Sequence, residues 1–600
     1  MRAALNGVKV LGTLLFGGVV AIGGTALAQV VPPVERNLPP VAAGTGRLVI
    51  GPQDLSGAED DTPFGVSLSG ITLIGATETP AKKPATGIRV GAIGAVDRAA
   101  IEPALAPFLG KPLSRKRIGE IQAAIALVYR TAGYPFVSVT VPPQEVTRGV
   151  VTLRVVEFRI GAVKTTGAAA GTEDALRARV RAAQGERIAA EALEEDLAWL
   201  NRQPYRTVNG VFAPGDALGL STLTLEVAQA KPWQVFGGWT NTGSHATGFD
   251  RFFAGFGAAL PGIPESFVSY QVTGSPNLWS NPASIGAGAN QPNYHSQAGR
   301  LVISTGARQS LEIAPSWVAS RQNGLDRSFA FTNETLEIPV TWRSAISNFA
   351  PGLQAGDLVV GAVGKTVSRD SWFTGTNIGG ASADLFEFFA GWSFSKTDAL
   401  GATSIDLRLI ANPGGVLGGN AGSRWSTYSG GRVTSVETAY GTAAINRVTR
   451  LPAGWNWVAS IAGTAAGEPL PDTEQLGLGG LYATRGYTID DASVDTGIVW
   501  RNELRTPTFS VLSAFGGAAI TDRASPFAFL DFGWGRTFGY QGIAGPVPRK
   551  DYSLAGAGLG LDYTIEGGFT ASVVGGFALS DATYTRAGDF NVQARLFVSY

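Results

Sequence analysis

Residues 567–580, which read GGFTASVVGGFALS, decide the fold of this chain. Side chains of an extended strand alternate between two faces, so Phe569 and Phe577 lie on one face and Thr570 and Ser572 on the other. A β-strand that crosses a lipid bilayer needs such an alternation of apolar and polar residues over about ten positions. The stretch therefore predicts a membrane-spanning β-strand with lipid on one face and water on the other.

The same alternation recurs throughout residues 232–600 and is clearest in residues 386–395, 559–565 and 592–600. Glycine and aromatic residues are frequent in this region, which has 368 residues from Trp233 to Tyr600. A strand with its connection takes roughly 22 to 25 residues, so the region holds about sixteen antiparallel strands. Closure into a barrel removes the unpaired strand edges that hydrocarbon would penalise. We therefore predict an all-β transmembrane β-barrel.

A soluble β-sandwich or β-helix is the alternative for this alternation, with the apolar face buried as a core. The aromatic content argues against it, since the chain has 30 Phe, 14 Tyr and 13 Trp. The last strand also ends flush at Tyr600, which shares the apolar face with Val598. Such an ending is typical of barrels that the barrel-insertion machinery recognises. We expect the bacterial outer membrane as the location, with its lipid around the barrel.

The N-terminal residues 1–28 have the organisation of a cleavable export signal. Arg2 and Lys9 precede an apolar run over residues 10–22, and residues 26–28 supply a small-x-small cleavage site. A membrane anchor is the alternative, but the run is short for a helix that must span a bilayer. We therefore expect export from the cytoplasm.

Composition and motifs argue against other functional classes. Lys plus Arg and Asp plus Glu both number 47, so no basic field attracts nucleic acid. The chain has no cysteine, which excludes disulfides and thiolate chemistry. Its two histidines, His245 and His295, have neither metal-site nor catalytic spacing, and we place both in loops near the barrel ends. We expect no enzyme, catalytic residue, metal or cofactor.

Two small α+β units precede the barrel, over residues 63–157 and 158–229. The expected elements of the first are strands near residues 66–74, 137–141 and 150–156 and a helix capped by Ser114 and stopped at Gly133. The expected elements of the second are a helix capped by Thr172, a helix striped by Leu193, Leu197 and Leu200, and a closing strand at residues 223–227.

These two units resemble polypeptide-transport-associated (POTRA) domains of two-partner secretion transporters. The first carries the turn of residues 132–135, Pro142-Pro143-Gln144 and Gly149 before a β-run. The second carries Leu200-Asn201-Arg202, Pro214-Gly215 and Gly219-Leu220-Ser221. One departure is Phe158, where the family more often has glycine, and it affects only a local turn. The resemblance implies that both units lie in the periplasm.

A pair of motifs near the end of the chain carries the same resemblance. Residues 475–495 include Thr484-Arg485-Gly486-Tyr487 and are similar to a loop that, in this family, folds back into the barrel. Phe529, Asp531 and Gly533 match the family's inner-wall F-x-D-x-G motif. The resemblance implies that Arg485 at the tip of the inward loop contacts Asp531. A surface turn and an unrelated lumen aspartate are the alternative. Thr484 departs from the usual valine.

The resemblance implies a transporter that captures an unfolded partner exoprotein, large and β-helical, and secretes it through the barrel. Family members export haemolysins, which some of them also activate, or adhesins, proteases or haem-scavenging proteins, and the residues do not choose among these. Two alternatives share the barrel: an assembly factor of the same superfamily, which usually has a different number of POTRA domains, and a solute porin.

Residues 29–62 form the link between the export signal and the first unit. They contain five prolines, and proline removes amide donors and fixes φ, so we interpret them as an extended linker. Many family members instead begin with a helix that plugs the barrel. Here the plug is either absent or a non-helical part of the linker.

Overall fold

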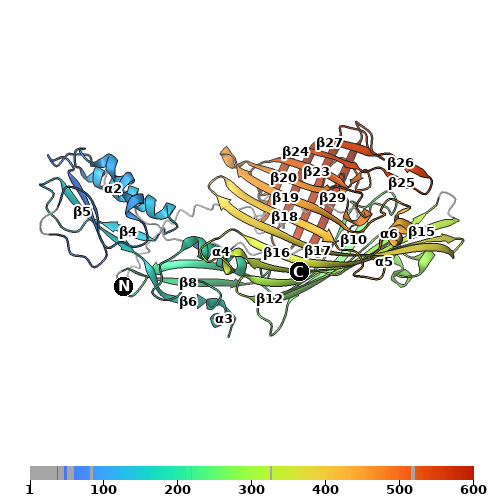
Figure 1. Cartoon of the computed structure of the whole chain (residues 1–600), viewed down its shortest axis with the longest axis horizontal. Helices are drawn as coiled ribbons and strands as arrows, with labels where there is room; N and C mark the ends of the chain where they lie inside the picture. The colour runs from blue at the N-terminus through green and yellow to red at the C-terminus, as the bar shows by residue number, and fades with distance from the viewer. Residues whose placement is uncertain are drawn as a thin grey trace, which may run out of the picture.

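The computed structural model describes residues 35, 37, 46, 48–49 and 60–600, apart from 82–84, 135, 170, 218, 325–327 and 515–520. Two small α+β units are followed by a large β-barrel (Figure 1). The export-signal prediction for residues 1–28 lies outside the described residues. No helix within the described ranges has the length and apolar character needed to cross a membrane.

The first unit is a four-stranded sheet with two α-helices. The sheet order is β3-β2-β5-β4, and the elements are β2 (Gly70–Ile74), β3 (Gly87–Val90), α1 (Arg98–Leu105), α2 (Arg115–Thr131), β4 (Val137–Thr140) and β5 (Val150–Glu157). Ser114 caps α2 as expected, since its Oγ accepts a hydrogen bond from the Arg117 N–H at 3.1 Å. The strand expected at residues 66–74 is shorter than predicted, because its pairing with β5 begins only at Gly70.

The second unit has the sheet order β1-β7-β8-β6. Its elements are β1 (Leu48–Val49), β6 (Arg159–Thr166), α3 (Glu173–Arg177), α4 (Ala190–Leu200), β7 (Arg206–Pro214) and β8 (Leu220–Gln229). The leucines of α4 pack on the sheet through Leu223 and Leu225. Thr172 precedes α3, but the prediction that its side chain caps this helix is wrong, because its hydroxyl donates to the Ala169 carbonyl at 2.7 Å.

The barrel is a closed antiparallel sheet. Its strands are β9 (Trp233–Thr240), β10 (Arg251–Ala259), β11 (Phe267–Gly274), β12 (Tyr294–Gly306), β13 (Gln309–Ile313), β14 (Ser316–Asn323), β15 (Phe329–Ala345), β16 (Asp357–Phe373), β17 (Thr376–Asp398), β18 (Gly401–Asn412), β19 (Thr438–Arg450), β20 (Asn456–Ala466), β23 (Thr496–Arg505), β24 (Asp522–Thr537), β27 (Lys550–Ile565), β28 (Phe569–Ala578) and β29 (Phe590–Ser599). β13 and β14 both lie between β12 and β15 and are separated only by Ala314 and Pro315. They count as one interrupted strand, so the predicted sixteen strands are confirmed.

Short elements fill the barrel loops. They are α5 (Pro276–Ser280), α6 (Gly422–Ser429), α7 (Val511–Ala514), the strand pairs β21 (Leu476–Gly477) with β22 (Ser493–Val494) and β25 (Tyr540–Gly542) with β26 (Gly545–Val547), and the 3-10 turns η2 (Pro282–Ser284), η3 (Gly288–Asn290), η4 (Ile346–Asn348), η5 (Pro452–Gly454) and η6 (Asp472–Glu474); η1 (Ala106–Phe108) follows α1 in the first unit. We call the barrel end with the turns at residues 346–356 and 399–400 the near rim. The end with the loops at residues 241–250 and 579–589 is the far rim.

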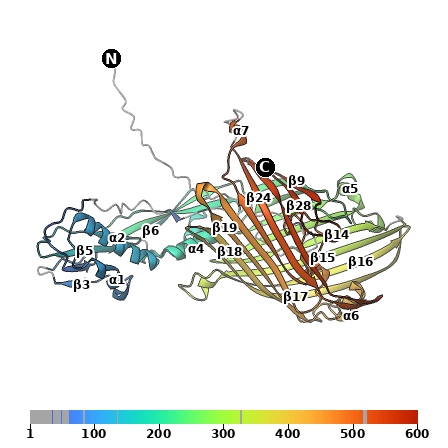
Figure 2. The same ribbon diagram turned by 90° about the horizontal axis from the view of Figure 1, so that it is seen from above.

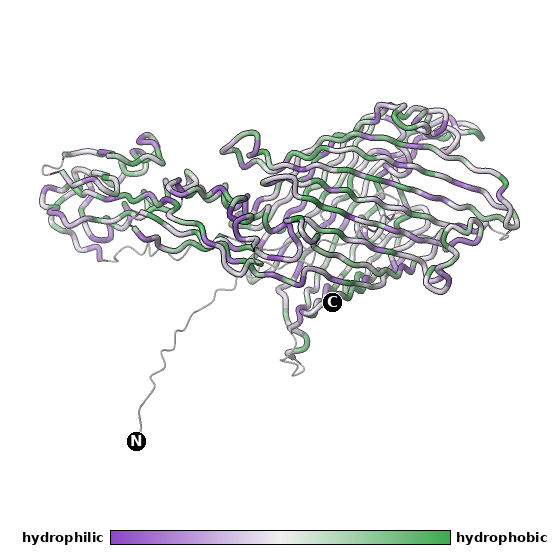
Figure 3. Tube along the Cα trace, turned by 90° about the horizontal axis from the view of Figure 1, so that it is seen from below, coloured by the Kyte–Doolittle hydropathy of each residue, from purple (hydrophilic) through white to green (hydrophobic). Residues whose placement is uncertain are grey.

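Alternation along the strands separates an apolar outer face from a polar inner face. On β28, Val573 and Phe577 are 42% and 50% exposed, whereas Val574 between them is buried. Hydrophilic and hydrophobic residues interleave along the barrel strands (Figure 3). β29 closes the ring against β9, and the backbone groups of Tyr600 and Val235 hydrogen-bond to each other in both directions.

The two histidines differ in their placement. His245 lies in the loop between β9 and β10, as expected. The same prediction is wrong for His295, which lies in β12, pairs with Gly274 and Ala319 on either side and is fully buried. Its ring meets the Trp317 ring edge-on at 4.6 Å. His295 belongs to a strand because β11 and β14 both pair with β12 at this position.

Charged side chains join the second unit to the near rim, where the two meet (Figure 2). Arg308 of the β12–β13 turn donates to the buried carboxylate of Asp196 at 2.9 Å, and Arg202 donates to Asp357 at 2.6 Å. Burial is the largest influence on Asp196 and raises the pKa of its carboxyl, although the Arg181 and Arg308 guanidinium groups act in the opposite direction. The opening of the barrel is thereby held against this unit.

Candidate functional site

The loop between β20 and β23 brings Arg485 against the inner wall of the barrel. The Arg485 side chain is 1% exposed, and the Asp531 side chain on β24 is 0% exposed. Arg485 Nε donates to Asp531 Oδ2 at 2.6 Å, and Nη2 donates to Oδ1 at 2.8 Å. This bidentate arrangement fixes the direction of the guanidinium as well as its position. The two residues that the motifs single out are therefore in direct contact.

A second carboxylate completes the site, from a strand segment, Arg501-Asn502-Glu503-Leu504, that also resembles the family but to which the sequence assigned no role. Arg485 Nη1 donates to Glu503 Oε1 on β23 at 2.6 Å. Glu503 also accepts from Arg501 at 3.3 Å and from Arg505 Nε at 2.7 Å, and Arg505 donates to Asp562 at 2.7 Å. These residues carry three positive and three negative charges, so the buried cluster is electrically balanced. Balance matters because an unpaired charge in such a place is strongly destabilising.

The aromatic residue of the wall motif supports the same guanidinium. The Phe529 ring lies 4.0 Å from Arg485 Cζ, within the range of a cation–π interaction, and the Phe527 ring lies at 5.6 Å. Phe529 also belongs to a buried apolar cluster with Leu481 and Val574. The loop therefore packs on the inner wall through apolar side chains that surround its ion pairs.

The glycines of the motifs allow the loop and the wall to approach closely. Gly486 has φ of +95°, and a Cβ on it would lie 3.0 Å from the Phe577 carbonyl. A Cβ on Gly533 would lie 2.7 Å from Thr484 Oγ1. Gly556, which no motif indicated, faces the Arg485 carbonyl, and a Cβ there would lie at 1.9 Å. Each position needs glycine because another backbone or side chain occupies the space.

Tyr487 holds the tip of the loop against β27, β29 and the loop that follows β28. The Tyr487 hydroxyl lies 2.8 Å from the Ala555 carbonyl, to which it donates, and accepts from the Ser580 N–H at 3.0 Å. Gln593 Nε2 on β29 donates to the Tyr487 carbonyl at 3.0 Å. The ring is fully buried. Hence all seven residues named in the two motifs lie where the loop meets the wall.

The base of the loop is held on the opposite wall. Glu474 in η6 pairs with Lys365 on β16, and its other oxygen lies 3.0 Å from the Tyr440 hydroxyl on β19. Asp495, at the end of the loop, pairs with Arg432 and accepts from the Leu470 N–H at 3.0 Å. Every contact named here is non-covalent, which allows the loop to have a second arrangement.

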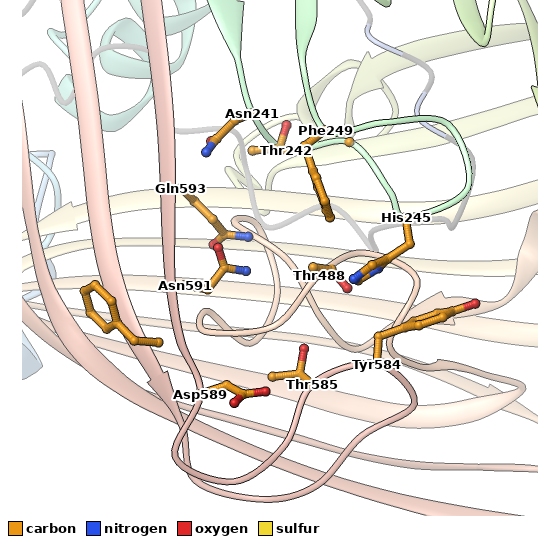
Figure 4. Close-up of a pocket in the computed structure, with 12 residues that line it drawn as sticks. Asn241, Thr242, His245, Phe249, Thr488, Tyr584, Thr585, Asp589, Asn591 and Gln593 are labelled. Atoms are coloured by element: carbon orange, nitrogen blue, oxygen red, sulfur yellow. The ribbon is translucent and has the colours of Figure 1, made fainter.

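The loop also contacts the far rim beside a pocket of about 380 Å³ (Figure 4). The His245 N–H donates to the Asp490 carboxylate at 3.0 Å, and the His245 ring stacks on the Tyr584 ring at 4.4 Å. Asp491 accepts from the backbone N–H groups of Tyr584 and Thr585 at 2.8 and 2.9 Å. The first and last loops of the barrel are thereby linked through the inward loop.

The linker also reaches the inner wall. Arg251, at the far-rim end of β10, is fully buried and donates to both oxygens of Glu35 at 3.0 and 3.2 Å. Asn37 donates to the Tyr294 hydroxyl at 2.6 Å. Glu35 and Asn37 are not helical. Of the two alternatives for the plug, these contacts favour a non-helical part of the linker.

Comparisons with known proteins agree with this arrangement. The chain matches the family model for the POTRA domain, ShlB-type, over residues 84–157, and the model for haemolysin secretion/activation protein ShlB/FhaC/HecB over residues 359–563. The outer membrane transporter CdiB-2 of Burkholderia pseudomallei is 23% identical over 473 residues, which are 76% of this chain and 73% of that protein.

Solved structures with the same fold include two CdiB proteins. CdiB from Escherichia coli has a TM-score of 0.63 at 18% identity, over 92% of this chain and 93% of the other. CdiB from Acinetobacter baumannii has a TM-score of 0.55 at 15% identity, over 89% and 90% of the two chains. The barrel region that matches the family model contains Arg485, Glu503 and Asp531.

Removal of the Arg485 side chain is expected to destabilise the barrel strongly. Arg485→Ala leaves two carboxylates without their shared partner, and breaking such a buried pair costs roughly 3 to 5 kcal/mol. Arg485→Lys keeps the charge but cannot bridge both carboxylates, so its effect should be intermediate. The midpoint of heat-induced unfolding, read from gel migration, measures both. Equal midpoints for the wild type and Arg485→Ala would show that Arg485 does not anchor the loop to the wall.

Thr484→Val is expected to stabilise the loop. The Thr484 side chain is fully buried, and its Oγ1 has no hydrogen-bond partner among the described residues. Valine has nearly the same shape and removes an unsatisfied hydroxyl, which costs about 1 to 3 kcal/mol when buried. The same heat-migration assay should show a higher midpoint for Thr484→Val and a lower one for Thr484→Ser, which keeps the hydroxyl but loses the methyl group. A lower midpoint for valine would refute the explanation.

Loss of the Glu35 carboxylate is expected to loosen the linker in the barrel. Because the chain has no cysteine, Asn37→Cys gives a unique label site for a membrane-impermeant thiol reagent. Adding Glu35→Ala should speed labelling at least severalfold, because Arg251 loses both ionic hydrogen bonds. Glu35→Gln, which keeps one acceptor, should lie between. Identical labelling rates in all three would mean that this ion pair does not hold the linker.

Proposed function

The chain belongs to the two-partner secretion family of outer-membrane transporters, and we propose that it captures an unfolded exoprotein in the periplasm and passes it through its barrel. The barrel lies in the outer membrane, with its POTRA units in the periplasm. The near rim therefore faces the periplasm, and the far rim faces the outside. The observation that most favours polypeptide export is the inward loop, which contacts charged and polar residues on two sides of the lumen through non-covalent bonds.

Capture is proposed to use an open sheet edge in the first POTRA unit. β4 pairs with β5 on one side, and within the described ranges no strand pairs with its other side. Such an edge presents unpaired N–H and C=O groups that an extended segment can bind. Main-chain hydrogen bonds do not demand one sequence, which suits a long and varied substrate. The exoprotein is proposed to be a large β-helical protein.

Passage through the barrel is proposed to require displacement of the inward loop. The loop has one arrangement here, in which Arg485 bridges Asp531 and Glu503. A substrate segment in the lumen would shift the loop toward a second arrangement if it bound that arrangement more tightly than the one seen here. The size of the shift would equal the difference between the two binding free energies. Folding of the exoprotein outside the cell would then make export directional. A solute porin would have no use for the two POTRA units.

Deletion of residues 63–229 tests capture by the POTRA units. The barrel should still insert, because its sheet is closed without these residues, whereas secretion of a co-expressed exoprotein that the intact chain secretes should stop. Secretion is measured as exoprotein in the medium, and insertion as heat-dependent gel migration. The intact chain at matched expression is the control. Secretion that persisted from the truncated chain would show that capture does not depend on these units.

A further inference from the structure

One sheet edge of the second POTRA unit is occupied by the chain's own linker. In each unit, the edge strand follows the second helix and pairs antiparallel with the last strand: β4 with β5, and β7 with β8. On its other side, the last strand pairs in parallel with a strand that precedes the two helices: β5 with β2, and β8 with β6. β4 and β7 are therefore equivalent. β1 pairs in parallel with β7, in the place that is open beside β4.

The linker fits this edge through two specific contacts. A Cβ on Gly210 of β7 would lie 3.0 Å from Leu48 Cδ1 and 3.1 Å from Leu197 Cδ1. The missing side chain at Gly210 thus leaves a site that an aliphatic residue fills. Gly46 lies so close to β7 that a Cβ there would be 2.0 Å from the Val208 carbonyl. The edge accepts a small residue followed, two positions later, by an aliphatic one.

The linker covers only part of the edge. β1 has two paired residues, Leu48 with Gly210 and Val49 with Val211, whereas β7 runs over nine residues. Leu48 remains partly exposed although it packs on the core of the unit. Asn201 already holds the N–H and the carbonyl of Val208, at 2.7 and 2.9 Å, so additional pairing would lie beyond Val211. An extended segment that also paired there would make more main-chain hydrogen bonds than β1 does and could replace it.

We propose that an extended segment of the exoprotein displaces β1 and pairs with β7 in its place. The incoming segment presents a small residue opposite Val208 and an aliphatic side chain to the site at Gly210. This proposal rests on the proposed capture of an exoprotein by the POTRA units and names a second binding edge and its selectivity.

A disulfide that joins β1 to β7 and can be reduced again tests whether β1 must leave this edge. Because the chain has no cysteine, Val49→Cys with Val211→Cys joins two register partners by a single disulfide. The reduced form should secrete the exoprotein, and the oxidised form should secrete at least tenfold less. Equal secretion by both forms would overturn the displacement of β1 while leaving capture by the POTRA units intact. Secretion by neither form, with the single-cysteine variants also inactive, would count against the proposed function instead.

Binding of a peptide to the full-length protein tests the same proposal independently of secretion. The probe is a fluorescent peptide with the sequence of residues 44–51, which contains the small and aliphatic residues of the linker. Gly46→Val in the protein should expel β1, because its side chain would collide with Val208, and should raise the affinity for the peptide at least tenfold. A peptide with aspartate at the Leu48 position should not bind. Tight binding to the oxidised double-cysteine protein would overturn the proposal.

Discussion

The buried guanidinium of Arg485 is the constraint on which the inside of this barrel depends. A positive charge that is 1% exposed requires compensation, and Asp531 and Glu503 supply it from two neighbouring strands. Arg505 and Arg501 then balance Glu503, and Asp562 balances Arg505. The charges of β23, β24 and β27 are in this way ordered around one side chain of the loop. The glycines at 486, 533 and 556 are needed because that side chain brings its backbone against the wall.

The same loop connects parts of the barrel that are far apart in the sequence. Its base is held by Lys365 and Tyr440 on one wall, its tip by Asp531 on the other, and its far-rim turn by contacts to His245 and Thr585. The linker adds a second occupant of the lumen through Glu35. None of these contacts is covalent. Such contacts, strong together and individually reversible, are what the proposed displacement of the loop during export requires.

The sequence predicted the features that depend on local pattern or on paired motifs. Alternation at residues 567–580 predicted a membrane strand, and length alone gave sixteen strands. The roles of Glu503 and Gly556 could not be predicted, because each is defined by a neighbour on another strand. Pro315 divides one strand into β13 and β14, and only the pairing with β12 and β15 shows that it remains one strand. His295 was placed in a loop because the pairing that extends β12 involves distant residues.

The linker escaped prediction for a related reason. Its prolines correctly excluded a long helix, but nothing local indicates that Leu48 fills the space left by Gly210 or that Glu35 meets Arg251. Both contacts join residues more than 150 positions apart. Patterns within a segment predict its conformation, whereas its partners depend on the complete fold.

A disulfide that joins the loop to the wall gives the most direct test of whether export requires the loop to leave the wall. Thr484→Cys with Gly533→Cys places two thiols where Thr484 Oγ1 and a Cβ at position 533 would be 2.7 Å apart. Secretion is then measured before and after reduction of the same preparation. A loop that must move predicts no secretion when oxidised and recovery when reduced. Equal secretion in both states would show that the exoprotein passes with the loop in place.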